Sequence, residues 1–251
     1  MFRPRLIPVL LLKDQGLVKS VKFKDFKYVG DPINAVKIFN DLNADELVFL
    51  DIEASKEKRC ISSEFVKDIG EEANMPFAVG GGISTIAQIQ ELIACGAEKV
   101  ILNTVASLKP EFVKEASDVF GSSTISVCID VKKNWLGKES IYIYAGKQAT
   151  KYKVLEFVKL MQEMGAGELI IQSVDNDGAM AGYDIELLKR VSEAVTIPVI
   201  ALGGAGSEAD FYDVLKNTYC TGLAAGSFFT YQNKERNILI NYPEKKIRNV
   251  E

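Results

Sequence analysis

The residues best suited to chemistry stand where apolar segments end. Asp130 follows the apolar residues 127–129, and burial at such a position would raise the pKa of its carboxyl toward that of a general acid or base. An acid paired with Lys132 or Lys133 at a rim is an equally good interpretation of the spacing. The chain has no histidine. Proton transfer therefore falls to carboxylate, lysine, tyrosine or cysteine side chains, and a Ser-His-Asp triad is excluded.

Two glycine-rich corners form a second candidate site. Residues 197–206 read Ile-Pro-Val-Ile-Ala-Leu-Gly-Gly-Ala-Gly, and residues 75–83 carry a similar pattern at an offset of 122 positions. Glycines after a strand let the backbone approach a ligand closely, and the free amides of a following helix suit a phosphate. One corner in each half predicts a ligand with a phosphate at each end.

The same offset relates other segments of the chain. It places residues 46–49 on residues 168–171, and Asn103-Thr104 on Ala225-Gly226. Agreement at three separated places predicts two homologous halves, about residues 1–120 and 121–251.

Eight alternations of strand and helix must position these groups. The expected strands are residues 6–12, 47–52, a strand ending at 80–82, 99–102, 124–131, 168–173, the start of 197–206, and 222–225. Expected helices include residues 32–42, 85–94, 154–164 and 208–215, with Asp31 and Asp184 as N-caps. Residues 13–30 are expected to form a polar loop over a ligand, and residues 132–151 a hairpin over the same site. The pattern predicts a single α/β domain over residues 1–251, a (β/α)8 TIM barrel.

Composition narrows the function classes. The net charge of -4 gives no reason to expect nucleic acid as a partner, and no apolar window reaches the ~18 residues that span a bilayer. Lys13 and Asp14 interrupt the first apolar run, so we expect no signal peptide, no membrane partner and a cytoplasmic location. The four cysteines are far apart in a chain without histidine, which favours reduced thiols and predicts neither a metal nor a cofactor.

Four charged residues stand at the opposite ends of the strands. They are two cations and two anions: Arg5, Glu46, Lys99 and Glu168. Charges so close to a barrel interior must be paired, because isolated buried ions are very costly. The group is either a structural ring of ion pairs or a gate that closes a central passage.

Taken together, the motifs resemble the cyclase subunit of imidazole glycerol phosphate synthase from Arg5 to about Phe229. The matching segments are residues 30–32, 45–52, 57–59, 79–83, 103–104, 177–178, 182–184 and 203–206. The resemblance implies two half-barrels, two phosphate sites, and a glutaminase partner at the N-terminal face of the barrel, with which the chain would form a heterodimer. Ammonia from that partner would pass through the barrel to the C-terminal face.

The resemblance also implies roles for single residues. Asp130 falls on a catalytic aspartate, the four strand-start charges fall on the gate, and Glu98 is expected to contact the glutaminase. The residues expected to bind a phosphorylated small-molecule ligand are Lys19, Asp51, Gly81, Gly82, Asn103, Thr104, Asp177, Gly178, Gly203, Gly204, Ala225 and Gly226.

One position departs from the family pattern. The second catalytic aspartate should end strand one, where this chain has Leu11, a residue that cannot transfer a proton. Four further positions differ from the family's usual residues: Ala145, Gln172, Ala179 and Leu202.

This departure resembles the family's divergent branch, which is thought to supply ammonia to a separate sugar amidotransferase in surface polysaccharide (O-antigen) assembly. There an acetamido group on a sugar becomes an acetamidino group. Two alternatives stay open. One is a working cyclase of histidine biosynthesis that tolerates Leu11, and the other is a non-catalytic scaffold that activates the glutaminase.

Overall fold

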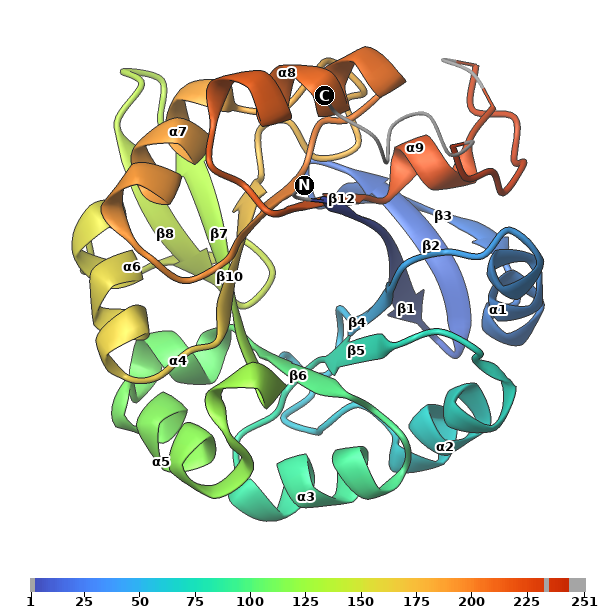
Figure 1. The fold of residues 1–251 in the computed structure, drawn as a ribbon, viewed down its shortest axis with the longest axis horizontal. Helices are drawn as coiled ribbons and strands as arrows, with labels where there is room; N and C mark the ends of the chain where they lie inside the picture. Colours follow the sequence, from blue (N-terminus) through green and yellow to red (C-terminus); the bar gives the residue numbers. More distant parts are fainter. Residues whose placement is uncertain (1–2, 233–234, 244–251) are drawn as a thin grey trace.

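Eight parallel strands close into a barrel in the computed structural model, which describes residues 3–232 and 235–243 (Figure 1). In order around the barrel these strands are β1 (Arg5–Lys13), β4 (Leu47–Asp51), β5 (Phe77–Gly80), β6 (Lys99–Leu102), β7 (Ile125–Lys133), β10 (Glu168–Ser173), β11 (Val199–Leu202) and β12 (Gly222–Ala225). Closure comes from the parallel pairing of β12 with β1, in which Arg5 lies opposite Gly222. The prediction of a single (β/α)8 barrel is confirmed.

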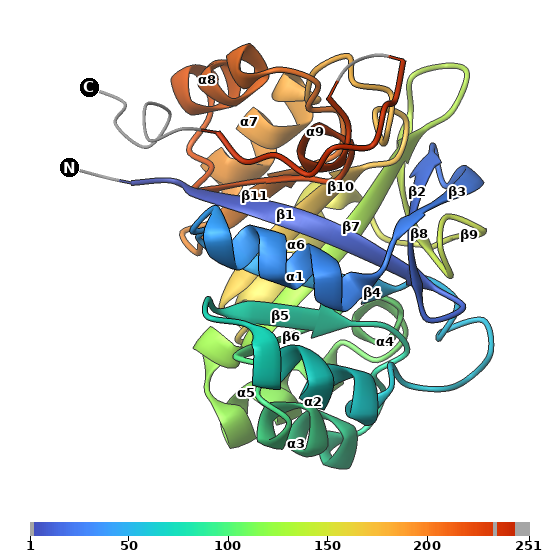
Figure 2. The same cartoon turned by 90° about the vertical axis from the view of Figure 1, so that its right-hand side faces the viewer.

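Helices surround the barrel on its outside (Figures 1 and 2). They are α1 (Pro32–Asp41), α2 (Ser63–Glu72), α3 (Ile86–Ala94), α4 (Thr104–Leu108), α5 (Glu111–Phe120), the 3-10 turn η1 (Ser122–Thr124), α6 (Val154–Glu163), α7 (Ile185–Ala194), α8 (Glu208–Asn217) and α9 (Ser227–Thr230). The expected N-caps are present, since Asp31 accepts a hydrogen bond from the Asn34 amide and Asp184 from the Leu187 amide.

Each barrel strand divides its side chains between two apolar clusters, because neighbouring residues of a strand point to opposite faces. On β1, Leu6 and Leu10 belong to the large cluster between the strands and the helices, whereas Ile7 and Val9 belong to the cluster inside the barrel. The inner cluster also holds Ile101, Cys128, Ile170 and others. Residues two apart on one strand therefore form successive layers of the barrel interior.

Residues 13–30 form a hairpin, and the prediction of a polar loop is wrong there. Strands β2 (Gly16–Val21) and β3 (Lys24–Gly30) pair in antiparallel fashion and extend β1 beyond the barrel. Asp14 and Gln15 both have positive φ, 48° and 64°, in the two-residue turn that joins β1 to β2. Such turns are normally recognised by a glycine. Here no glycine occupies the turn, which explains why the sequence pattern concealed it.

The expected hairpin over residues 132–151 is present. Strand β8 (Glu139–Ile143) pairs with the outer part of β7, and β9 (Gln148–Ala149) pairs with β8. The two hairpins lie at the same end of the barrel (Figure 2) and approach each other, since a Cβ atom on Gly146 would lie 3.0 Å from the ring of Phe23.

Over residues 3–232 and 235–243, no helix is long and apolar enough to cross a membrane. The prediction that the chain has no signal peptide concerns a segment that begins with Met1 and Phe2, which lie outside the described residues. All four cysteines carry free thiols, with Cys128 and Cys220 buried and Cys60 and Cys95 half-buried.

Candidate functional site

An ion-pair layer occupies the N-terminal end of the barrel. Arg5 bridges Glu46 and Glu168, with 2.8 Å between its Nη2 and Glu168 Oε2. Lys99 Nζ lies 3.3 Å from Glu46 and 3.1 Å from Glu168. Ser126 completes the layer by donating a hydrogen bond of 2.7 Å to Glu168. The four predicted strand-start charges thus lie together, and each faces an opposite charge.

Mutual attraction favours the charged forms of Glu168 and Arg5. Burial alone would raise the pKa of the Glu168 carboxyl, but Lys99 and Arg5 outweigh burial and hold that pKa below its ordinary value. Burial would likewise lower the pKa of Arg5, and the charges of Glu168 and Glu46 raise it instead. Glu98, the expected contact for a partner, is exposed at the start of β6, next to Lys99.

A small cavity of about 10 Å³ lies above this layer inside the barrel. Glu46 lines it, and the rest of its lining is Ile7, Val9, Val48, Leu50, Cys128, Ile170, Ile200, Leu202 and Ala224. Apart from Glu46 and the thiol of Cys128, these side chains are hydrocarbon. The cavity shares Val9, Leu50, Cys128 and Leu202 with the larger pocket above it.

That larger pocket has a volume of about 390 Å³ and opens at the C-terminal ends of the strands. Nine of the predicted site residues line it: Lys19, Asp51, Gly81, Gly82, Asn103, Thr104, Asp130, Asp177 and Gly226. The hairpins contribute Phe23, Phe26, Tyr144 and Ala145 to the same pocket.

Four predicted ligand residues lie outside the pocket lining: Gly178, Gly203, Gly204 and Ala225. Gly204 has a φ of 118°, and a Cβ atom there would collide with the carbonyl oxygen of Gly182. A Cβ atom on Gly178 would collide with the Ser20 carbonyl oxygen. These two glycines are explained by close packing of backbone on backbone. The first phosphate corner opens into the pocket at Gly81 and Gly82, whereas the second corner, residues 197–206, contributes only Leu202 to the lining.

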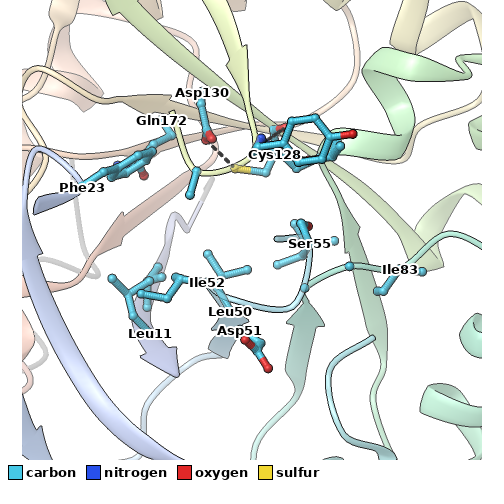
Figure 3. Close-up of a pocket in the computed structure, with 18 of the residues that line it drawn as sticks. Leu11, Phe23, Leu50, Asp51, Ile52, Ser55, Ile83, Cys128, Asp130 and Gln172 are labelled. Carbon is cyan, nitrogen blue, oxygen red and sulfur yellow. Dashed lines mark hydrogen bonds between the residues drawn. The ribbon is translucent and has the colours of Figure 1, made fainter. Parts of the chain in front are cut away.

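Asp130 is the buried acid of the pocket, with 7% of its surface exposed. The Cys128 thiol donates to Asp130 Oδ1 over 3.7 Å (Figure 3). Burial raises the pKa of Asp130 to about 7, with a further increase from Asp177, although hydrogen bonds from Cys128 and Asn103 act in the opposite direction. The carboxyl is therefore suited to gain or lose a proton near neutral pH.

Lys19 reaches the pocket from β2 and is 3% exposed. Its ammonium donates a hydrogen bond of 2.5 Å to the Val9 carbonyl. Burial lowers the pKa of Lys19 to about 8, although the charge of Asp177 partly offsets that effect. Asp177 accepts hydrogen bonds from Gln172 and Ser20 at 3.0 and 3.3 Å, and burial raises its pKa.

Asp51 lines the pocket, and both of its carboxylate oxygens have hydrogen-bond partners. Arg59 forms a bidentate ion pair with it, and the Glu53 and Ala54 amides each donate to its Oδ1 over 3.0 Å. This carboxylate fixes the loop after β4 as well as facing the pocket.

The wall around Leu11 is apolar. Leu11 and Leu50 pack against the inner cluster of the barrel, which includes Leu202. Strands β1 and β7 are four steps apart in either direction around the barrel, so Leu11 and Asp130 belong to opposite walls of the pocket. Figure 3 shows both side chains in the pocket, with the Leu50 and Ile52 side chains near Leu11.

Cys128 is the site residue that sequence reasoning missed as a functional group. A signal was available, because Cys128 and Asp130 are two apart in one strand and must face the same side. Phe23 lies between β2 and β3, in the segment predicted to be a polar loop, so its place in the pocket lining was not expected.

Comparisons with known proteins show the family of this chain. Residues 5–235 match the family model described as "Histidine biosynthesis protein". The chain is 42% identical over 244 residues to the "Putative imidazole glycerol phosphate synthase subunit hisF2" of Pseudomonas aeruginosa, covering 97% of each chain.

Two further relatives are each named imidazole glycerol phosphate synthase subunit HisF. The Halalkalibacterium halodurans protein is 42% identical over 233 residues, covering 92% of each chain, and the Petrotoga mobilis protein is 43% identical over 230 residues, covering 91% of each. The chain therefore belongs to the histidine biosynthesis protein family, as a HisF-like homologue of the cyclase subunit of imidazole glycerol phosphate synthase.

Proposed function

We propose that this chain is the synthase-type subunit of a glutamine amidotransferase pair and that its ammonia goes to a sugar. A glutaminase subunit would release ammonia at the N-terminal face, and the barrel would conduct it to the pocket. The observation that carries the choice of acceptor is the apolar wall at Leu11, opposite Asp130. A ring closure that requires two opposed carboxyls lacks one of them here.

The interior of the barrel supports conduction. The small cavity touches Glu46 of the ion-pair layer at one end and shares four lining residues with the pocket at the other. Its hydrocarbon lining favours neutral ammonia over ammonium, because an unpaired charge in such surroundings is very costly. Opening the layer would require Lys99 or Arg5 to leave its two glutamates for a short time.

The proposed acceptor reaction is the conversion of an acetamido group on a sugar into an acetamidino group during surface polysaccharide assembly. The nitrogen of ammonia would replace the carbonyl oxygen, which leaves on an activating group supplied by a separate amidotransferase. The barrel would contribute delivery of ammonia and exclusion of water.

A cyclase of histidine biosynthesis is the second candidate, favoured by family membership and by the retained Asp130 and Lys19. The two candidates separate in one assay, in which the purified chain receives the histidine-pathway ribonucleotide and ammonium salt. We expect turnover at least ~10²-fold below that of a cyclase with both carboxyls. Turnover at the ordinary rate of such a cyclase would remove the sugar proposal.

A scaffold that only activates the glutaminase makes a different prediction. For a scaffold, opening the ion-pair layer leaves the transfer of glutamine nitrogen into product unchanged. We expect Lys99→Ala to lower the product formed per glutamine hydrolysed, because ammonia then escapes. Lys114→Ala, which removes an exposed lysine 59% accessible on α5, is the matched control.

The proposed docking face contains the ion-pair layer and Glu98. Cross-linking of the assembled pair should place the glutaminase next to Glu98. Cross-links confined to the β2–β3 hairpin, at the other end of the barrel, would contradict this placement.

A further inference from the structure

Cys128 stands at the junction of the two hollow spaces in the barrel. It lines the small cavity above the ion-pair layer and also the large pocket. Val9, Leu50 and Leu202 share that position, but their side chains carry no hydrogen-bonding group. A molecule that leaves the cavity for the pocket therefore passes a thiol.

The thiol is held in a fixed arrangement. Cys128 and Asp130 alternate with Ile129 on β7, so both point into the barrel, and each is 7% exposed. Cys128 Sγ lies 3.7 Å from Asp130 Oδ1, as the dashed line in Figure 3 shows. Asn103 Nδ2 donates a hydrogen bond of 3.0 Å to the Cys128 carbonyl and ties β6 to β7 at this level.

Burial determines which atom carries the proton. It raises the pKa of the Cys128 thiol well above the ordinary value, and Asp130 adds to that increase. The side chain therefore stays an S–H group at neutral pH. A buried thiol of this kind is a hydrogen-bond donor and a poor nucleophile.

We propose that Cys128 is a positioning residue that orients the Asp130 carboxylate at the point where the passage meets the pocket. Its S–H group holds Oδ1 toward the junction, so that ammonia entering the pocket meets a carboxylate already turned toward it. The hydrogen bond also stabilises the ionised form of Asp130. The part that concerns ammonia rests on the proposed function, whereas the orientation of Asp130 does not.

Other charged groups near Asp130 set the background for its titration. The ionisable residues lining the pocket, besides Asp130 and the thiol, are Lys19, Asp51, Lys58, Arg59, Asp177 and Tyr144. Asp177 acts directly on Asp130 by raising its pKa. Lys19 faces Asp177, and Arg59 pairs with Asp51.

The test is the titration of Asp130 followed by carboxyl NMR in protein labelled with carbon-13 at aspartate, with the Asp130 signal assigned by its loss in Asp130→Asn. Cys128→Val keeps the volume of the side chain and removes the donor. We expect it to raise the Asp130 titration midpoint by about one pH unit. Cys128→Ser restores a donor and should return the midpoint to the wild-type value or below it.

Cys220→Ala is the matched control, because Cys220 is also a buried free thiol and lies outside the pocket lining. It should leave the Asp130 midpoint unchanged. An unchanged or lower midpoint in Cys128→Val would overturn the proposal, as would a midpoint in Cys128→Ser equal to that in Cys128→Val. The wild-type S–H infrared band should shift as Asp130 titrates, and a band insensitive to that titration would also count against it.

These readouts need no acceptor and no glutaminase. A shifted midpoint without delivery of ammonia would retain the role of Cys128 and remove the proposed function. Delivery of ammonia with an unshifted midpoint would retain the proposed function and remove the role of Cys128.

Discussion

The two ends of the barrel interior differ in what determines the pKa values of their charged groups. At the N-terminal end, Glu46 and Glu168 each face both Arg5 and Lys99, and attraction favours the charged forms of Glu168 and Arg5. At the C-terminal end, burial dominates, so Asp130 holds its proton up to about pH 7 and Lys19 loses its proton near pH 8. The difference separates charges that hold a structure closed from groups that can exchange protons with a ligand.

The largest expected effect on stability comes from disrupting the ion-pair layer. Glu168→Ala leaves Arg5 and Lys99 with half of their partners and Ser126 without its acceptor. Removing one member of a buried ion pair typically costs about 3–5 kcal/mol. We expect a loss of that size in the free energy of unfolding, measured by urea denaturation.

The exposed pair between Lys114 and Asp118 calibrates this result. Lys114→Ala should cost less than about 1 kcal/mol. Equal losses of unfolding free energy in the two variants would show that the ion-pair layer contributes no more to stability than an exposed ion pair.

The next largest effect concerns the C-terminal end of the barrel, where substitution of the charged residue should raise the free energy of unfolding. The pKa of Asp130 is about 7 in the folded protein against 3.8 ordinarily, so between these values the unfolded chain releases a proton that the folded protein keeps. Stability therefore falls as the pH rises through this window. Asp130→Asn removes the penalty and should be more stable than wild type by about 2–4 kcal/mol at pH 8.

At pH 4 the same variant should match wild type, because Asp130 is then protonated in the folded protein. Urea denaturation at the two pH values measures the difference. A variant less stable than wild type at pH 8 would mean that favourable contacts outweigh the cost of burying the Asp130 carboxylate, as they do for the charges of the ion-pair layer.

The smallest effect compares two serines. Ser126 donates to Glu168 over 2.7 Å, and Ser20 donates to Asp177 over 3.3 Å. Ser126→Ala should lower the free energy of unfolding by about 1.5 kcal/mol, and Ser20→Ala by about 0.5 kcal/mol. The reverse order in thermal or urea unfolding would contradict the contrast between the two ends.

Much of the fold could be predicted from the sequence, because buried parallel strands are continuous apolar runs and because Asp31 and Asp184 cap helices in the expected way. The β2–β3 hairpin was not predictable, since its lysines conceal the alternation and its turn lacks glycine. The twofold repeat stays a prediction.

The sequence predicted which polar residues stand at the strand ends of the site. It did not predict the contacts among them. The pattern placed Gly203 and Gly204 with the ligand, whereas contact with the loop at Gly182 accounts for Gly204. The pairing of Asp51 with Arg59 and the reach of Lys19 to the Val9 carbonyl depend on how loops fold over the barrel. Such contacts join residues from different elements, which spacing along the chain does not encode.

We propose that the passage through the barrel is present while Leu11 occupies the place of one of two opposed acids. The most direct test of this proposal is the rate of ring closure on the histidine-pathway ribonucleotide with ammonium salt, compared between wild type, Leu11→Asp and Leu11→Asn. We expect Leu11→Asp to exceed both other proteins by about 10²-fold or more, the usual contribution of a general acid or base. A wild-type rate equal to that of Leu11→Asp would contradict it.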